Sequence, residues 1–334
     1  MAKCAWAPTN MILVGDVGGT KTLLEIGTLQ DGRWQPALAG RYAAADSPDL
    51  HGVVRSFLRE WAARRRSQGA ITHACFGVAG PTFDNRAQMT NLPWSVDATA
   101  VSGEFGIPCV QVVNDFAAAA HGIEMLQDAD LVALQRGEPV PAAPRLVIGA
   151  GTGLGVAYLV SAGAGYRVIP GETGHAGFAP ATLEQAQLWR DLHARYGRVT
   201  AEDVVSGPGL VRIYEHIERT AGRSAAPAGI TPAAIVRGAI ESGDPPSLRA
   251  LDLFIACYGE VAGNCALAVL ARGGVYVAGG IAPRIISRLM TGGFLAAFNA
   301  KGAYSDTLRK IPVSVVTDER LGLLGCALIA GRGS

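Results

Sequence analysis

Two glycine-rich turns, each placed between two buried-strand patterns, constrain the fold of this chain most strongly. The apolar run at 11–14 leads into the turn 15–20 (GDVGGT), and a second apolar run follows at 22–29. The same order recurs 134 residues later, where 146–148 leads into 149–155 and the apolar run 156–160 follows. A strand on both sides of a short turn indicates a hairpin. The sequence therefore predicts one such hairpin in each of two domains.

Strand and helix patterns alternate around the first hairpin. Strands are predicted at 71–78 and 108–113, a helix is predicted to open at Ser47-Pro48-Asp49, and another covers 116–126. This alternation is typical of α/β proteins. The proline-rich stretch 139–144 is the best linker candidate, and a strand at 274–278 is followed by a helix predicted to start at Pro283. The apolar helical segment 321–329 could pack back on the first domain.

Composition narrows the classes of function. The chain has 334 residues, enough for two domains, and its 43 glycines are about twice the usual share. Its 29 basic and 28 acidic residues give a net charge of +1, which argues against nucleic-acid binding. Six cysteines without a C-x-x-C pair argue against a disulfide framework or a zinc site. Residues 1–10 lack a signal-peptide pattern, and the uncharged stretch 146–166 holds six glycines, so we expect a cytoplasmic protein outside the membrane.

Residues 15–22 nearly match a phosphate-binding P-loop, but Thr20 stands where the motif needs a glycine before Lys21. The segment after the turn is also strand-like, whereas a P-loop opens a helix. A glycine-lined hairpin with exposed N–H groups remains a nest for phosphate oxygens. Asp16 in such a turn makes physical sense with a cation between carboxylate and phosphates, which implies Mg²⁺. A plain tight turn is the alternative.

The second turn, 149–155, suggests dinucleotide binding but lacks the G-x-G-x-x-G pattern, because Leu154 occupies the last required glycine. As a second phosphate cradle opposite the first, it would let two domains clamp one polyphosphate.

Asn114 and Asp115 close a buried strand and precede a helix, the place where α/β sheets bind ligands. Asp115 could accept the proton of a hydroxyl that attacks phosphorus, and Asn114 could orient that hydroxyl. An equally good interpretation makes Asp115 an ordinary helix N-cap.

Glu172 and His175 lie three residues apart among glycines. Metal ligation is one interpretation, recognition of a polyhydroxylated ligand fits better, and a satisfied loop histidine is the third. Glu202 could be a further ligand or only the acid of a helix first turn after Thr200.

Five motifs in register make the chain resemble the bacterial ATP-dependent glucokinases of the hexokinase/actin-like ATPase superfamily. After the first turn they are 113–116 (VNDF), 149–156 (GAGTGLGV), 170–175 (PGETGH), 206–210 (SGPGL) and 278–284 (AGGIAPR). The resemblance covers nearly the whole chain and implies a ribonuclease H-like α/β fold. It implies a small domain at 1–125 plus 316–334, a large domain at 126–315, and a cleft between them.

The resemblance also implies the reaction: transfer of the γ-phosphoryl group of ATP to the 6-hydroxyl of glucose, giving glucose 6-phosphate and ADP as the first step of glycolysis. Asp115 would be the catalytic base, and the sugar would be held by Asn114, Asp115, Glu172, His175 and Glu202. The nucleotide would be held by Gly15, Asp16, Val17, Gly18, Gly19, Thr20, Gly151, Thr152, Gly153, Gly279 and Gly280. Asp16 would bind Mg²⁺ through water, and a homodimer is implied.

Three alternatives remain. A sugar kinase for another hexose would share most contacts, although the repressor–kinase branch would carry a cysteine zinc cluster that this chain lacks. A nucleotide-switched actin-like binding protein would keep the phosphate turns without needing Asn114, His175 or Glu202. A dehydrogenase would bind NAD(H).

Overall fold

The computed structural model describes residues 11–64, 69–89, 92–163, 165–222 and 229–332, and the expectations about residues 1–10 lie outside them. The chain forms two compact units. The first unit consists of the described part of Met1–Gln127 together with that of Arg320–Ser334, and the second unit is Asp128–Glu319.

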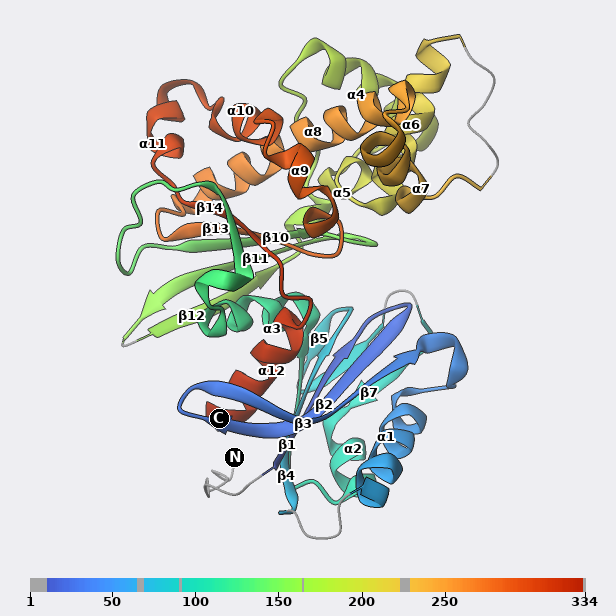
Figure 1. The fold of residues 1–334 in the computed structure, drawn as a ribbon, viewed down its shortest axis with the longest axis vertical. Helices are drawn as coiled ribbons and strands as arrows, with labels where there is room; N and C mark the ends of the chain where they lie inside the picture. The colour runs from blue at the N-terminus through green and yellow to red at the C-terminus, as the bar shows by residue number, and fades with distance from the viewer. Residues whose placement is uncertain (1–10, 65–68, 90–91, 164, 223–228, 333–334) are drawn as a thin grey trace. The chain divides into compact units, whose positions relative to one another are not determined.

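A five-stranded sheet in the order β3-β2-β1-β4-β8 forms the centre of the first unit (Figure 1). Its strands are β1 (Met11–Val17), β2 (Lys21–Gln30), β3 (Arg33–Ala43), β4 (Ile71–Val78) and β8 (Cys109–Asn114). The first three strands are antiparallel neighbours, and β1, β4 and β8 are parallel. The predicted hairpin is present, but the third antiparallel strand was not predicted.

Helices cover both faces of this sheet. On one face, α1 (Leu50–Arg64) and α2 (Ala98–Phe105) pack on strand residues such as Leu13 and Phe76. On the other face, α3 (Asp115–Gly122) and α12 (Leu321–Arg332) pack together, although they are about 200 residues apart in sequence (Figure 1). They can approach closely because Gly325 lies against the Ala118 carbonyl, where a Cβ would collide. A small antiparallel sheet of β5 (Thr82–Phe83), β6 (Arg86–Gln88) and β7 (Ser95–Asp97) completes the unit.

The second unit repeats the same topology. Its sheet has the order β12-β11-β10-β13-β14-β9 and contains β9 (Leu131–Gln135), β10 (Arg145–Ala150), β11 (Leu154–Ala162), β12 (Gly165–Gly171), β13 (Gly274–Ala278) and β14 (Val313–Val316). Strand β10 pairs antiparallel with β11 and parallel with β13, as β1 does with β2 and β4. The prediction that the glycine hairpin occurs once in each unit is therefore confirmed.

Most helices of the second unit gather on one core. They are α4 (Leu183–Tyr196), α5 (Ala201–Val204), α6 (Gly207–Thr220), α7 (Pro232–Arg237), a π-helical segment (Gly238–Ser242), α8 (Pro245–Val269), α9 (Ile286–Leu289), α10 (Gly293–Asn299) and α11 (Ser305–Arg309). Helix α8 is long and apolar enough to cross a membrane, but 67% of its most apolar window is buried inside the unit. Strands β10 and β11, not a membrane helix, account for most of the uncharged stretch.

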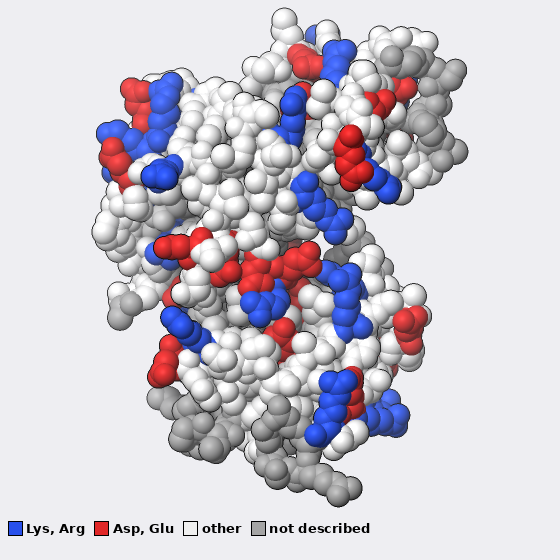
Figure 2. All heavy atoms as spheres, in the orientation of Figure 1, with Lys and Arg blue, Asp and Glu red and all other residues white. Residues whose placement is uncertain are grey.

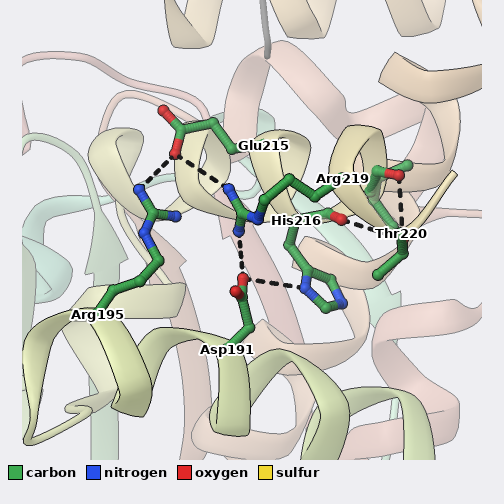
Figure 3. Close-up of polar contacts among 7 residues, drawn as sticks. Asp191, Arg195, Glu215, His216, Arg219 and Thr220 are labelled. Carbon is green, nitrogen blue, oxygen red and sulfur yellow. Dashed lines mark hydrogen bonds and ion pairs between the residues drawn. The ribbon is translucent and has the colours of Figure 1, made fainter. Parts of the chain in front are cut away.

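Ion pairs join α4 to α6 (Figure 3). Asp191 on α4 pairs with Arg219 and accepts from the Nδ1 of the buried His216, at 3.1 Å, while Glu215 pairs with Arg195 at 3.0 Å. Basic and acidic side chains are interspersed on the face of the molecule drawn in Figure 2.

Some predicted boundaries were wrong. Ser47 does not cap α1, because the helix begins only at Leu50, three residues after Ser47. Asp49 instead accepts a hydrogen bond from Gly52 N at 2.8 Å, as an N-cap does. The helix predicted from Pro283 is a 3₁₀ turn, Ala282–Ile285, before the short α9.

Four cysteines are free and buried, as expected: Cys75, Cys257, Cys265 and Cys326.

Candidate functional site

The first glycine turn is a closed hairpin. Asp16 pairs with Leu23 and Val17 with Thr22, and Gly18 N donates to Lys21 O at 3.0 Å. The chain continues as a strand, so the distinction from a P-loop is confirmed. Gly15 has a packing role, because a Cβ there would lie 2.5 Å from Phe76 Cδ1.

Asp16 is a partly buried carboxylate at the end of β1. Burial raises its pKa, and the nearby Lys21 ammonium only partly opposes that effect. A Cβ on Gly322, at the start of α12, would lie 3.4 Å from Asp16 Oδ2. The carboxylate therefore lies beside the positive end of a helix. A carboxylate oxygen whose charge is disfavoured by burial is a donor that fits Mg²⁺.

No group of three His, Cys, Asp or Glu side chains able to hold a metal occurs among the described residues. That finding suits Mg²⁺, which usually takes one or two carboxylates and completes its shell with phosphate oxygens and water.

Asp16 and the Asn114-Asp115 pair lie at the same edge of the first sheet. Asp16 is level with Gly77 of β4, and Gly77 with Val113 of β8. Because neighbouring strands are about 4.8 Å apart, the Asp16 and Val113 backbones are separated by about 10 Å. This edge is formed by the carboxyl ends of three parallel strands, where α/β sheets bind ligands.

The N-cap of α3 is Asn114. Its Oδ1 accepts from Phe116 N at 2.9 Å and Ala117 N at 3.0 Å, while its Nδ2 donates to Gly80 O at 3.2 Å. Asp115 is the first residue of the helix, and its Oδ1 accepts from Phe116 N at 2.8 Å. The N-cap interpretation of Asp115 was therefore wrong, because the side chain before it performs that function.

Gly80 is a supporting residue that the sequence analysis did not select. Its φ is +156°, and a Cβ there would collide with Gln88 O, so only glycine suits this path. Its carbonyl fixes the Asn114 amide. The available signal was Gly80-Pro81 directly after a buried strand.

The second glycine turn, residues 151–153, joins β10 to β11 in the second unit. Gly151 N donates to Gly153 O at 2.8 Å, and Gly207 N at the start of α6 donates to Gly151 O at 2.8 Å. Because a strand follows, the dinucleotide-binding interpretation is excluded for this turn.

Glu172 and His175 flank a short 3₁₀ turn beside that glycine turn. Their Oε2 and Nε2 atoms are 3.9 Å apart, and both side chains are exposed. Between them, Gly174 lies against the Leu154 carbonyl, where a Cβ would collide. The pair is thus presented to solvent directly beside the first residue of β11.

Glu202 belongs to the same neighbourhood. Thr200 and Asp203 form the capping box of α5, so Glu202 is not the capping acid. Its Oε2 accepts from Leu154 N at 2.7 Å. Glu172, His175 and Glu202, predicted from separate motifs, therefore converge around Leu154.

Gly279 and Gly280 follow β13, and Gly279 packs on the residue before the second turn. Gly279 has φ +83°, and a Cβ there would lie 2.5 Å from Ala150 O, the residue before the turn. Gly280 lines a cavity of about 600 Å³ bounded by α6, α7 and 280–284. The lining residues include Thr231, Pro232, Arg237 and Arg284.

This cavity adjoins the turn through Gly207, whose added Cβ would lie 3.3 Å from both Gly151 O and Pro232 Cγ. Its size suits an organic ligand. The sequence analysis did not select its α7 residues because no motif marks them.

Solved structures of sugar kinases have this fold. A glucokinase from an Antarctic psychrotroph is 30% identical, with a TM-score of 0.85, over 97% of this chain and 99% of that one. A ROK-family glucokinase from Streptomyces griseus, in complex with glucose and AMPPNP, is 20% identical with a TM-score of 0.66, over 97% and 100%. The predicted fold class is confirmed: the protein has the actin-like ATPase fold of sugar kinases.

The sequence comparisons narrow this class. A glucokinase family model matches residues 13–332. A curated glucokinase of Nostoc punctiforme is 40% identical over 97% of this chain and 99% of its own length. The chain belongs to the glucokinase family, and the predicted resemblance is confirmed.

Proposed function

We propose that the protein is an ATP:hexose 6-phosphotransferase that converts glucose and ATP to glucose 6-phosphate and ADP. One observation carries the assignment of the chemistry: Asp16 and Asp115 lie at the same edge of three neighbouring parallel strands. We assign a cation to the Asp16 carboxylate and the proton of the sugar hydroxyl to the Asp115 carboxylate. Family membership supports the substrates, since the Streptomyces griseus neighbour was solved with glucose and AMPPNP.

In the proposed reaction, Asp115 accepts the proton of the sugar 6-hydroxyl as its oxygen attacks the γ-phosphorus of ATP. A bond forms between that oxygen and phosphorus, and the bond from phosphorus to the β–γ bridging oxygen breaks, releasing ADP. The transition state of phosphoryl transfer is loose, so positioning and charge stabilisation do most of the work. Asp115 serves this role as a carboxylate fixed at the first turn of α3.

The nucleotide is assigned to both glycine turns. Because Gly18 N donates to Lys21 O and Gly151 N donates to Gly153 O, the N–H groups assigned to phosphate oxygens are those of residues 19–20 and 152–153. We assign the adenosine to the cavity beside Gly280, since that cavity adjoins the second turn. Mg²⁺, when bound near Asp16, neutralises charge on the phosphates. The sugar hydroxyls are assigned to Asn114, Glu172, His175 and Glu202.

A coupled assay with glucose, fructose, mannose and N-acetylglucosamine tests this proposal, with and without Mg²⁺. We expect Mg²⁺-dependent ADP formation that requires glucose. A preference for another hexose would reassign the substrate, and ATP turnover indifferent to every sugar would favour an actin-like binding protein instead.

The resemblance further leads us to propose a homodimer with a cytoplasmic location. Light scattering after size-exclusion chromatography tests the oligomeric state, for which we expect twice the 34.6 kDa chain mass.

A further inference from the structure

The carboxylate of Glu202 does not cap its own helix, α5, but contacts another segment of the chain. Helix α5 is capped by Thr200, whose backbone N–H and hydroxyl both donate to Asp203 Oδ2 at 2.8 Å. Glu202 instead reaches out of the helix, and its Oε2 accepts from Leu154 N at 2.7 Å. Leu154 is the residue directly after the second glycine turn. The carboxylate is therefore attached to the turn.

The segment 202–207 holds both ends of this turn. At one end, Gly207 N donates to Gly151 O at 2.8 Å, and at the other, Glu202 holds Leu154 N–H. Ser206 joins the two attachments, because its hydroxyl donates to Glu202 O at 2.7 Å. Peptide groups fixed at both ends are preorganised, so an anion that binds them need not order the loop first.

The contact between Glu202 and Leu154 requires a glycine at position 153. A Cβ on Gly153 would lie 2.5 Å from Glu202 Oε2 and 3.2 Å from Glu202 Cδ. The glycine thus gives the carboxylate its path to Leu154 N. The contact with Glu202 is enough to explain why residue 153 is a glycine, without a close approach of phosphate to its backbone.

The negative charge of Glu202 repels phosphate groups bound at the turn, so Glu202 cannot act by attracting the nucleotide. What Glu202 supplies is an acceptor that orients a peptide N–H group, and hydrogen bonds to charged acceptors are stronger than neutral ones. The Oε1 atom has no partner among the described residues, and a carboxylate can accept several hydrogen bonds.

We propose that Glu202 is a positioning residue for the phosphate turn 151–153, and that one carboxylate thereby serves both substrates. Oε2 sets the turn for the nucleotide, and Oε1 accepts from a sugar hydroxyl. This inference rests on the proposed function and adds to it, because it makes Glu202 a residue of the nucleotide site as well as of the sugar site.

The test measures AMPPNP binding with Mg²⁺ in the absence of sugar, by calorimetry. We expect Glu202→Ala to weaken AMPPNP binding at least about five-fold, the effect of losing one oriented hydrogen bond. Glu202→Gln keeps a carbonyl acceptor for Leu154 N, so its AMPPNP affinity should stay near that of the wild type. Both variants should bind glucose more weakly. A residue used only for sugar would leave AMPPNP binding unchanged in both.

A double-mutant cycle with Gly153→Ala isolates the contact. The added methyl group displaces the carboxylate, so Gly153→Ala should weaken AMPPNP binding about as much as Glu202→Ala does. The double variant should be no weaker than either single one, because the contact can be lost only once. Losses that add would show that Gly153 acts directly on the nucleotide, and would overturn the proposal.

Asp203→Ala is the matched control. It removes the neighbouring carboxylate and the capping box of α5 but leaves the Leu154 contact in place. Its AMPPNP affinity should stay near wild type even if its melting temperature falls. If Glu202→Ala does not fold, the AMPPNP affinities of Glu202→Gln and Gly153→Ala are compared instead. The proposal requires near wild-type affinity in Glu202→Gln and weaker binding in Gly153→Ala. An inactive wild type would refute the proposed function, whereas an active wild type with unchanged AMPPNP binding in Glu202→Ala and Gly153→Ala refutes only this inference.

Discussion

At the scale of single residues, Asn114 and Asp115 have different roles at the start of α3: Asn114 caps the helix, and Asp115 is its first residue. Asn114 Oδ1 and Nδ2 are used to cap the helix and to hold Gly80 O, which fixes the local backbone. Asp115 follows with its carboxylate in the first helical turn. The helix is thus capped by the Asn114 amide, and the Asp115 carboxylate is not its cap.

We expect Asp115→Ala and Asp115→Asn to lower kcat at least about 100-fold, the lower range for a positioned proton acceptor. Glucose binding should be largely retained, because the other proposed sugar ligands remain. Steady-state kinetics with glucose, together with glucose titration of the free protein, checks both effects. Near-normal turnover in either variant would remove Asp115 from its role as the base.

Asp16 should show opposite effects on stability and activity. Burial raises its pKa, which means that the folded state disfavours its charge. Asp16→Asn removes that charge at nearly constant size, so the melting temperature should rise. The kcat should fall at least about 100-fold, since metal-assisted charge stabilisation is worth several kcal/mol. Thermal unfolding and kinetics test the two parts separately.

Asp46→Asn is the control for this variant, because Asp46 is an exposed residue of the same unit. It should change the unfolding free energy by no more than about 0.5 kcal/mol. A lower melting temperature in Asp16→Asn would contradict the desolvation argument.

At the scale of elements, the contact between α4 and α6 depends on Asp191 (Figure 3). This carboxylate accepts from the buried His216 ring and pairs with Arg219. Asp191→Ala leaves a buried ring nitrogen without its partner, so we expect a loss of about 1–3 kcal/mol in unfolding free energy. Denaturant unfolding of the full chain measures it.

Glu184→Ala supplies the comparison on the same helix. Glu184 pairs with Arg249 at 3.2 Å, and both side chains are largely exposed. Exposed pairs contribute about 0–1 kcal/mol, so this variant should be clearly less destabilised than Asp191→Ala. Equal losses would show that burial of His216 does not decide the cost.

The elements of the site were predictable where local chemistry dictates them. Both glycine hairpins follow from strand patterns on either side of a turn, and the position of Asn114 and Asp115 at a carboxyl strand end follows from a polar pair ending a buried strand. Two contacts of the site could not be predicted from the sequence. The capping role of Asn114 depends on Gly80, 34 positions earlier, and the Glu202 contact joins segments 48 positions apart. Sequence periodicity carries no information on such pairings.

At the scale of the whole molecule, the two sheets share one plan. Each has three antiparallel strands followed by two that run parallel to the third, and the second sheet adds the antiparallel edge strand β9. Each places its glycine turn after the first strand of its hairpin, β1 or β10. The plan explains why one chain carries two glycine turns: each unit supplies one from the same structural position. The first unit adds Asp16 and Asp115, and the second unit adds the cavity beside Gly280.

The first unit should lose stability in mild acid because of two histidines. Burial lowers the pKa of His73 below its usual 6.5, and burial also lowers that of His121, with Arg332 adding to the effect and Glu124 opposing it. Below about pH 6.5 these two histidines are protonated in the unfolded chain but remain largely neutral in the folded protein. Stability that is present at neutral pH is therefore lost as the pH falls below about 6.5. The slope is at most about 1.4 kcal/mol per pH unit for each ring.

Thermal unfolding between pH 5 and pH 8 measures this loss, and His73→Gln with His121→Gln isolates it. Glutamine cannot titrate, so the double variant should lose less stability than the wild type on going from pH 7.5 to pH 5.5. Asp16 acts in the opposite direction, because its raised pKa lets the folded state bind a proton first as the pH falls. The pH dependence should accordingly be steeper in Asp16→Asn than in the wild type. Identical profiles for wild type and histidine variant would show that neither ring governs acid stability.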